Sequence, residues 1–249
     1  MKLKMKTPLI AGAILCALTA QSAFAAIALD RTRVVYNGSQ KSISLNVSNE
    51  NKQLPYLAQG WIEDAQGNKI TSPLAVLPPV QRIEPGAKSQ VKVQGLPAAA
   101  QLPQDRESLF YFNLREIPPR TDKPNTLQIA LQTRIKMFYR PKLLEITSGD
   151  TPWQEQITLT KQGGKYMVNN PTPYFITLVD AKASAKGESV KEFQPLMVEP
   201  NGQSLMTAGV SSLGNSPVLT YINDYGARPQ LQFSCKASSC VATPVNSSH

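Results

Sequence analysis

The sequence predicts an all-β protein built from two immunoglobulin-like β-sandwich domains. Short segments in which apolar and polar residues alternate recur along the chain, with turn residues between them. Twenty prolines and 14 glycines are spread over the 249 residues and disfavour long helices. The first half holds roughly seven alternating segments in about 115 residues, which is the spacing of an immunoglobulin-like sandwich.

The first residues have the pattern of a secretory leader. Three lysines precede a mostly apolar run that ends at Ala20, and Ala23-Phe24-Ala25 matches an A-x-A cleavage site. The apolar run is too short to cross a bilayer. We therefore expect residues 1–25 to be a cleaved signal peptide and Ala26 to begin an exported chain with no stable membrane insertion. Loss of the three lysines lowers the formal net charge from +9 to +6.

The expected strands divide into two groups. Those of the first group are Arg33–Tyr36, Ser42–Val47, Tyr56–Ile62, Ala75–Val80, Gln90–Val93, Ser108–Glu116 and Leu127–Tyr139. Those of the second group are Gln156–Thr160, Lys165–Asn169, Tyr174–Ala183, Gln194–Val198, Gln203–Met206, Val218–Tyr225 and Gln230–Cys235. A boundary between Pro141 and Pro152 gives domains of residues 26–142 and 143–249, each of ordinary domain size. Thr243 to His249 are expected to form a frayed tail.

Two features of the expected strands stay open. Pro78-Pro79 interrupts one of them, so that segment is an edge, a bulge or a cis turn, and the isomer is not predicted. In the longest segment, Leu127, Ile129 and Leu131 form an apolar row. Strict alternation places Lys136 on the opposite face from this row, unless a bulge intervenes.

Two cysteines remain after the leader, which contains Cys16, is removed. Cys235 and Cys240 are close in sequence, and disulfides persist in exported proteins. We expect one bridge that closes a tight loop and contributes about 2 kcal/mol to stability. Two cysteines without a neighbouring histidine do not make a metal-ligand set, so no metal site is expected.

The sequence offers little for catalysis. The one histidine is His249, at the chain end, which leaves a serine or cysteine nucleophile without a credible base. Asp105 and Glu107 resemble a pair of glycosidase acids, but a charged cluster beside a turn is more often structural. No phosphate-binding or dinucleotide motif is present, so we expect neither an enzyme nor a cofactor. The modest positive charge, without an aromatic-basic motif, gives no reason to expect nucleic-acid binding.

One block carries a specific resemblance. Leu102–Pro119, LPQDRESLFYFNLREIPP, resembles the signature of the periplasmic pilus chaperones, the PapD-like family, and is closest to its P-pilus type. Further similar blocks lie at Leu29–Gly38, Asn51–Glu63, Pro78–Ser89, Leu131–Pro141, Asn170–Leu178 and Tyr221–Pro229. The resemblance therefore runs through almost the whole chain after the leader.

The resemblance implies a boomerang of two sandwiches that binds pilus subunits in the periplasm. The subunits are incomplete immunoglobulin-like folds, and the chaperone lends them a strand by donor-strand complementation. It then delivers them to an outer-membrane usher without ATP. Leu127, Ile129 and Leu131 would enter the groove of the subunit. Taken without the family, the same row reads as ordinary core.

The resemblance also assigns roles to charged residues. Arg33 and Lys136 would anchor the C-terminal carboxylate of the subunit in the cleft between the domains. Glu107, Arg140 and Asp224 would form an interdomain salt bridge. Without the family, Arg33 reads as a solvated strand charge and Lys136 as an edge cation whose head reaches water.

Other functions are compatible with a two-sandwich protein. A secreted adhesin or carbohydrate-binding module would favour exposed aromatic residues on loops, whereas the aromatic residues here fall mainly inside expected strands. A pilus subunit would have a single incomplete domain and a free, alternating N-terminal extension. Which pilus system the chain serves, the interdomain angle, and whether the free form self-associates through its long strand are left open.

Overall fold

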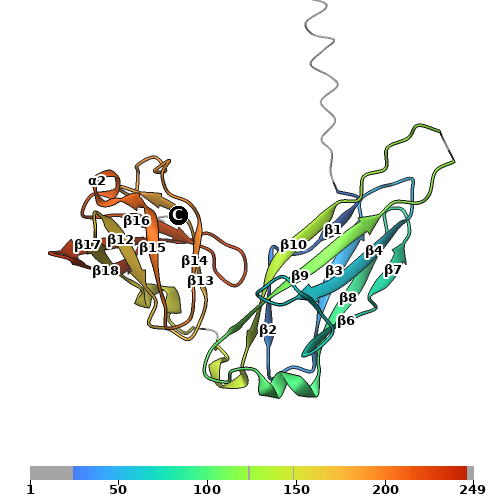
Figure 1. The fold of residues 1–249 in the computed structure, drawn as a ribbon, viewed down its shortest axis with the longest axis horizontal. Coiled ribbons are helices and arrows are strands. Elements are labelled where there is room, and N and C mark those ends of the chain that lie inside the picture. Colours follow the sequence, from blue (N-terminus) through green and yellow to red (C-terminus); the bar gives the residue numbers. More distant parts are fainter. Residues whose placement is uncertain (1–24, 123, 148, 246–249) are drawn as a thin grey trace, which may run out of the picture.

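The computed structural model describes residues 25–122, 124–147 and 149–245, which fold into two lobes made almost wholly of strands (Figure 1). The expected all-β class is therefore confirmed. The expected leader, apart from Ala25, and His249 lie outside the described residues. Within the described part, no helix is long and apolar enough to cross a membrane.

The first lobe is a sandwich of two sheets. One sheet has the order β1 (Ile27–Leu29), β3 (Ser42–Asn49), β8 (Lys88–Gly95) and β6 (Leu74–Leu77). The other has the order β2 (Arg33–Asn37), β10 (Gln132–Arg140), β9 (Ser108–Ile117), β4 (Tyr56–Glu63) and β5 (Lys69–Ile70), with β7 (Val80–Ile83) also paired to β4. The short 3-10 helix η1 (Pro97–Gln101) connects β8 towards β9.

Alternating side chains of both sheets fill the space between them. Val34, Leu45, Val93, Phe112 and Met137 are among the fully buried residues of this core. Because successive side chains of a strand point to opposite faces, the residues between these core positions face away from the sandwich. In β10, Lys136 and Phe138 flank the core residue Met137 and therefore lie on the outward face of the sheet.

The segment expected as one strand from Ala75 to Val80 is instead two. β6 ends at Leu77 and pairs with β8, whereas β7 begins at Val80 and pairs with β4 in the other sheet. The two prolines between them have no amide hydrogen for a ladder, so the chain changes sheets there. The Leu77–Pro78 peptide bond is cis.

The longest expected strand is shorter than its alternation suggested. β10 begins at Gln132 and not at Leu127. The neighbouring strand β9 ends at Ile117 and is followed by Pro118 and Pro119, which cannot donate hydrogen bonds to a partner. The Glu116 amide still donates to the Leu131 carbonyl at 3.0 Å, and the regular ladder begins at the next residue.

The second lobe is a single curled sheet with its core inside. The order of its strands is β14 (Leu196–Val198), β13 (Ile176–Lys182), β16 (Val218–Tyr221), β17 (Gln230–Lys236), β18 (Ser239–Pro244), β11 (Thr158–Gln162), β12 (Lys165–Asn169) and β15 (Gln203–Gly209). The helix α2 (Val210–Leu213) follows β15. Leu159, Tyr166, Leu178, Met206 and Phe233 are fully buried in the core.

The expected frayed tail, Thr243 to His249, is wrong for its first residues, and residues 246–249 lie outside the described part of the chain. β18 runs through Thr243 and Pro244 and pairs with both β17 and β11. Cys235 and Cys240 are cross-strand partners in the β17–β18 hairpin and form the expected disulfide. The bridge lies across this hairpin, whose second strand, β18, is the last along the chain but an inner strand of the sheet.

Short elements connect the lobes between Arg140, where β10 ends, and Thr158, where β11 begins. They are the 3-10 helices η2 (Lys142–Leu144) and η3 (Trp153–Gln156). The Tyr174 hydroxyl donates to the Leu144 carbonyl at 3.0 Å, and the Glu107 amide donates to the Pro173 carbonyl at 2.9 Å. The second lobe is thereby held by hydrogen bonds both to this connection and to the first lobe.

Candidate functional site

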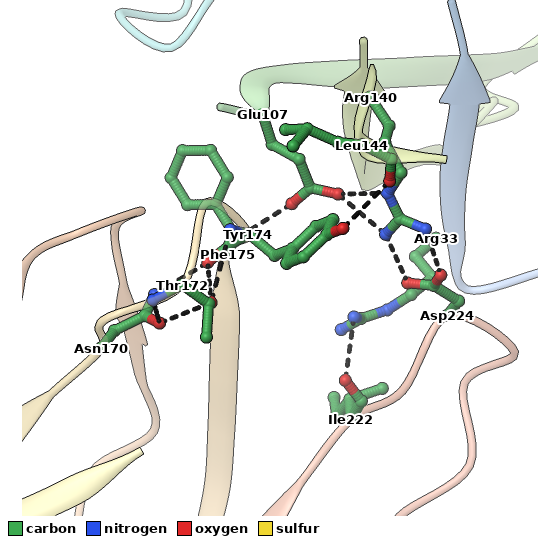
Figure 2. A network of polar contacts seen from close by, with 10 residues as sticks. All are labelled: Arg33, Glu107, Arg140, Leu144, Asn170, Thr172, Tyr174, Phe175, Ile222 and Asp224. Carbon is green, nitrogen blue, oxygen red and sulfur yellow. Dashed lines mark hydrogen bonds and ion pairs between the residues drawn. The ribbon is translucent and has the colours of Figure 1, made fainter. Parts of the chain in front are cut away.

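Arg33 and Lys136 are brought together by strand pairing. β2 and β10 run parallel, and Lys136 is the register partner of Arg33. Both residues lie on the outward face of their sheet, since Val34 and Met137 beside them are core residues. Arg33 is only 8% exposed, and its Nη1 donates to the Ile222 carbonyl of the second lobe at 3.1 Å (Figure 2). Its guanidinium carbon lies 5.6 Å from the centroid of the Phe138 ring.

The electrostatics of this pair favour an anion. Burial lowers the pKa of Arg33, although Asp224 and Glu107 act to raise it. The pKa of Lys136 is also lowered, by burial first and by repulsion from Arg33 second. Two cations that have lost water and repel each other would both be stabilised by a carboxylate placed between them.

A buried ion network lies next to the pair. Arg140, the last residue of β10, donates from Nε to Glu107 Oε1 at 2.9 Å (Figure 2). Its two terminal nitrogens bond to both carboxylate oxygens of Asp224, at 2.7 and 3.1 Å. Its guanidinium carbon also lies 5.0 Å from the ring centroid of Trp153 and 5.1 Å from that of Tyr174. Arg140 therefore joins carboxylates from both lobes.

The local turns put these carboxylates in place. Glu107 immediately precedes β9, and its second oxygen accepts from the Phe175 amide at 2.8 Å. Asp224 lies in the turn after β16, where Asn223 Oδ1 accepts from the amides of Tyr225 and Ala227. A side chain that bonds the backbone ahead of it in this way defines a tight turn.

The network shifts the pKa values of its members. Burial raises the pKa of Glu107 to about 7, although Arg140 and the Phe175 amide act to lower it. For Arg140 burial has the opposite effect, but bonds to Asp224 and Glu107 outweigh it and raise the pKa above its ordinary value. Arg140 is therefore charged under all physiological conditions.

A cleft of about 950 Å³ lies between the lobes. β2, the connection between the lobes and the loop after β16 line it, and Arg33, Arg140, Asp224 and the 96% exposed Tyr225 contribute side chains. The cleft is thus charged, with cations and carboxylates close together. Its walls come from both lobes, so its width depends on the angle between them.

The apolar row lies outside both the core and this cleft. Leu127 is 85% exposed, Ile129 63% and Leu131 45%. Gln128, between the first two, donates from Nε2 to the Pro119 carbonyl at 2.6 Å. The row leads directly into β10 and so into Lys136.

The remaining candidate pair does not assemble. Asp105 contacts Arg106 at 3.3 Å on the surface, whereas Glu107 turns inward to Arg140. No group of three or more His, Cys, Asp or Glu side chains in the described part of the chain is arranged to hold a metal. No sequence pattern signals the contacts of Ile222 and Phe175, because both act through backbone atoms that are far from their partners in sequence.

Comparisons with known proteins agree with this architecture. Residues 26–145 match the family described as pili and flagellar-assembly chaperone, PapD N-terminal domain. Residues 152–233 match the family described as pili assembly chaperone PapD, C-terminal domain. The two matches fall on the first and the second lobe.

Similar proteins are found at high identity. The probable fimbrial chaperone YfcS of Escherichia coli (strain K12) is 54% identical over 228 residues, which cover 92% of this chain and 90% of the relative. The chaperone protein PapD of Escherichia coli is 53% identical over 217 residues, covering 87% and 89%. Among solved structures, the periplasmic chaperone SfaE is similar with a TM-score of 0.66 and 33% identity, over 83% of this chain and 98% of that one. This chain belongs to the PapD family of pili assembly chaperones.

Proposed function

We propose that this chain is a periplasmic chaperone that binds pilus subunits by donor-strand complementation and delivers them, without ATP, to an outer-membrane usher. One observation carries this proposal: an exposed apolar row leads directly into a strand that presents a paired lysine and arginine. Membership of a family of pili assembly chaperones supports it. The alternative of a secreted adhesin is not favoured by these relatives.

The row supplies the added strand. Backbone groups of residues 127–131 would pair with an edge of the subunit, while Leu127, Ile129 and Leu131 fill successive pockets of its groove. Backbone bonds give affinity with little dependence on sequence, and the alternating side chains give the fit. The observed exposure of the three side chains supports this role, since they need not leave a core to act.

The cations would fix the position of the subunit. Arg33 and Lys136 would bind its C-terminal carboxylate through charge-assisted hydrogen bonds, which are stronger than neutral ones. A pinned terminus sets the register of the added strand. A slip of one residue would turn the apolar face of that strand away from the groove.

Glu107, Arg140 and Asp224 would hold the angle between the lobes at which the cleft accepts the subunit. A buried ionic set of this kind adds little net stability but penalises other arrangements, because any of them leaves a buried charge unpaired. Its bonds to both lobes support this assignment.

Export would follow from cleavage after Ala25. N-terminal sequencing of the protein recovered from the periplasm should begin at Ala26. A mature chain that starts at another residue would contradict the cleavage site, and a chain that keeps its first residues would contradict the cleaved leader.

The function is tested by co-export with a candidate pilin. Periplasmic extract is separated by size exclusion, and a photoreactive amino acid at position 129 reports what the row touches. We expect a one-to-one complex in which position 129 crosslinks to the pilin. A pilin that accumulates without this chain, or a complex in which position 129 does not crosslink to the pilin, would overturn the proposal. Crosslinks between two copies of this chain in the pilin-free extract would establish self-association.

A further inference from the structure

The outward face of the β4–β9–β10 sheet carries a second cluster of cations. Its members, which we term the stacked-cation face, are Trp61, Glu63, Lys69, Tyr111, Arg115 and Arg134. Trp61 faces outward, because its strand neighbours Gly60 and Ile62 face the core. Lys69 Nζ lies 5.4 Å and Arg115 Cζ 5.1 Å from the ring centroid of Trp61, and the side chain is only 9% exposed.

Each arginine of this face is held in place. The Arg134 guanidinium carbon lies 3.4 Å from the centroid of the Tyr111 ring, and its Nε donates to Glu63 Oε2 at 2.8 Å. The other oxygen of Glu63 accepts from Trp61 Nε1 at 3.0 Å. Arg115 Nη2 donates to Gln132 Oε1 at 3.0 Å. A guanidinium that is stacked on a ring and bonded along one edge keeps its charge and its remaining N–H groups.

The charges of this face do not balance. Lys69, Arg115 and Arg134 are opposed within it by Glu63 alone. Burial acts to raise the pKa of Glu63, but hydrogen bonds from Arg134 and Trp61 outweigh it, so the pKa is lowered and the carboxylate stays ionised. Arg134 is nevertheless 41% exposed at its side chain. The face presents a net positive charge, and its guanidinium groups are already held in fixed positions.

The stacked-cation face adjoins the anchor. Arg134 precedes Lys136 by two residues on the same face of β10, which places the two Cα atoms about 7 Å apart. Tyr111 is the register partner of Lys136, and Glu63 is the register partner of Tyr111. A partner whose terminus reached Lys136 would therefore lie over this face as well.

We propose that the stacked-cation face is a second contact surface for the pilus subunit, and that it selects clients with aspartate or glutamate side chains about 7–14 Å from the anchored terminus. This inference rests on the proposed function. Carboxylates match the free edge of a guanidinium, and arginines that are already ordered lose little further entropy on binding. Charges at the rim of an interface act mainly on the association rate and its salt dependence.

The test measures how fast a complex forms when a denatured pilin is diluted into a solution of the full chaperone. The association rate is measured in about 0.05 M and about 0.5 M NaCl, where screening is weak and strong. The variant is Arg115→Gln/Arg134→Gln. Its matched control, Lys88→Gln/Lys92→Gln, removes two exposed cations from β8 in the other sheet. Arg115→Lys/Arg134→Lys changes the same two positions but keeps their charge, so it separates an effect of charge from an effect of substitution on the fold.

At low salt we expect Arg115→Gln/Arg134→Gln to associate about tenfold more slowly than wild type, with the difference largely lost at high salt. The β8 control and the lysine variant should stay within about twofold of wild type. Equal rates for the glutamine variant and the β8 control would overturn the inference, and so would a rate loss that persists in high salt, which would indicate a structural role.

A reference variant separates this inference from the function on which it rests. Ile129→Asp is measured beside the others. If Ile129→Asp blocks the complex while Arg115→Gln/Arg134→Gln does not slow it, only the second surface is wrong. If Ile129→Asp binds like wild type, the donor strand is wrong as well.

Discussion

At the scale of single residues, Arg33 has two kinds of contact: it bonds the second lobe, and it faces the cleft between the lobes. The sequence suggests a solvated charge or, through the family, a carboxylate anchor. The structure shows it nearly buried and bonded to the Ile222 carbonyl of the other lobe. No pattern in the sequence predicts such a bond, because the acceptor is a backbone atom 189 residues away. In the proposed anchor role, an arginine that bonds the second lobe and faces the cleft would link client binding to the position of that lobe.

Arg33→Ala should weaken subunit binding by about 2 kcal/mol, or roughly 30-fold, because one charge-assisted contact to the terminal carboxylate is lost. Lys136→Ala should have a similar effect. Isothermal titration with a peptide of the pilin C-terminal strand measures it, and the same peptide with an amidated terminus is the control. Each variant keeps one cation of the pair, so amidation should reduce the binding of wild type more than that of either variant. An equal loss for all three would contradict the anchor assignment.

Glu107 makes stability depend on pH. Its pKa is about 7 in the folded protein and near its ordinary 4.5 when unfolded, so the folded state binds more protons between these values. Its contribution is therefore fully present below about pH 4.5 and is lost as the pH rises through 7, by at most about 3 kcal/mol. Urea unfolding across this range should show this slope in wild type. Glu107→Gln, which cannot ionise, should remove it, and an unchanged slope would contradict the assignment.

At the scale of strands, alternation located most elements but not their ends. β12 coincides with its expected range. The segment expected as one strand is divided into β6 and β7 by two prolines, and β10 starts late because two prolines follow its neighbour β9. A strand needs a neighbour with amide hydrogens, and that neighbour is remote in sequence. Alternation therefore shows which face a residue occupies but not where its ladder stops. This is why alternation alone predicted the apolar row at Leu127 to Leu131 but not the exposure of its side chains.

Ile129→Asp should abolish the complex with the subunit, since an unpaired carboxylate in an apolar pocket costs several kcal/mol. The fold should be unchanged because the side chain is 63% exposed in the free protein. Co-purification from the periplasm measures the complex, and thermal unfolding measures the fold. Leu205→Asp, at an exposed leucine of the second lobe, is the matched control and should bind normally. Wild-type yield with Ile129→Asp would mean that another segment is donated.

The β17–β18 hairpin should tolerate loss of its disulfide. The bridge closes a sequence separation of 5 residues, and a loop this short stabilises by about 2 kcal/mol. Cys235→Ser/Cys240→Ser should lower the free energy of unfolding by that amount in a urea titration and leave subunit binding intact. If the variant failed to fold at all, β18 would depend on the bridge far more than its loop length implies.

At the scale of the whole molecule, the two-lobe architecture was predictable, but its geometry was not. Family blocks named Glu107, Arg140 and Asp224, and these three residues do meet. The angle between the lobes also depends on the Phe175 amide, the Pro173 carbonyl and the stacking of Phe138 on Phe175. These contacts involve backbone atoms or residue types that occur throughout any core, so no sequence pattern distinguishes them.

Arg140→Met should lower the free energy of unfolding by about 3 kcal/mol at about pH 8, where Glu107 is ionised in the folded wild type and would lose its counter-charge. Small-angle scattering should show a broader range of interdomain distances. Adding Glu107→Gln should restore much of the stability, since no buried charge then remains, but not the fixed angle. If Arg140→Met alone had the stability and scattering of wild type, the other contacts between the lobes would be sufficient to hold them.

The two prolines that follow β9 have a consequence for the conditions under which the protein works. The missing amide hydrogens of Pro118 and Pro119 are a covalent property, which neither titrates nor responds to ionic strength. The availability of the adjoining segment is therefore insensitive to the chemical environment. Binding at the proposed anchor and at the proposed stacked-cation contact would, in contrast, weaken as salt rises. In a compartment whose salt concentration changes, the donated strand would stay equally available, whereas the selection of clients by charge would be weaker at high salt and stronger at low salt.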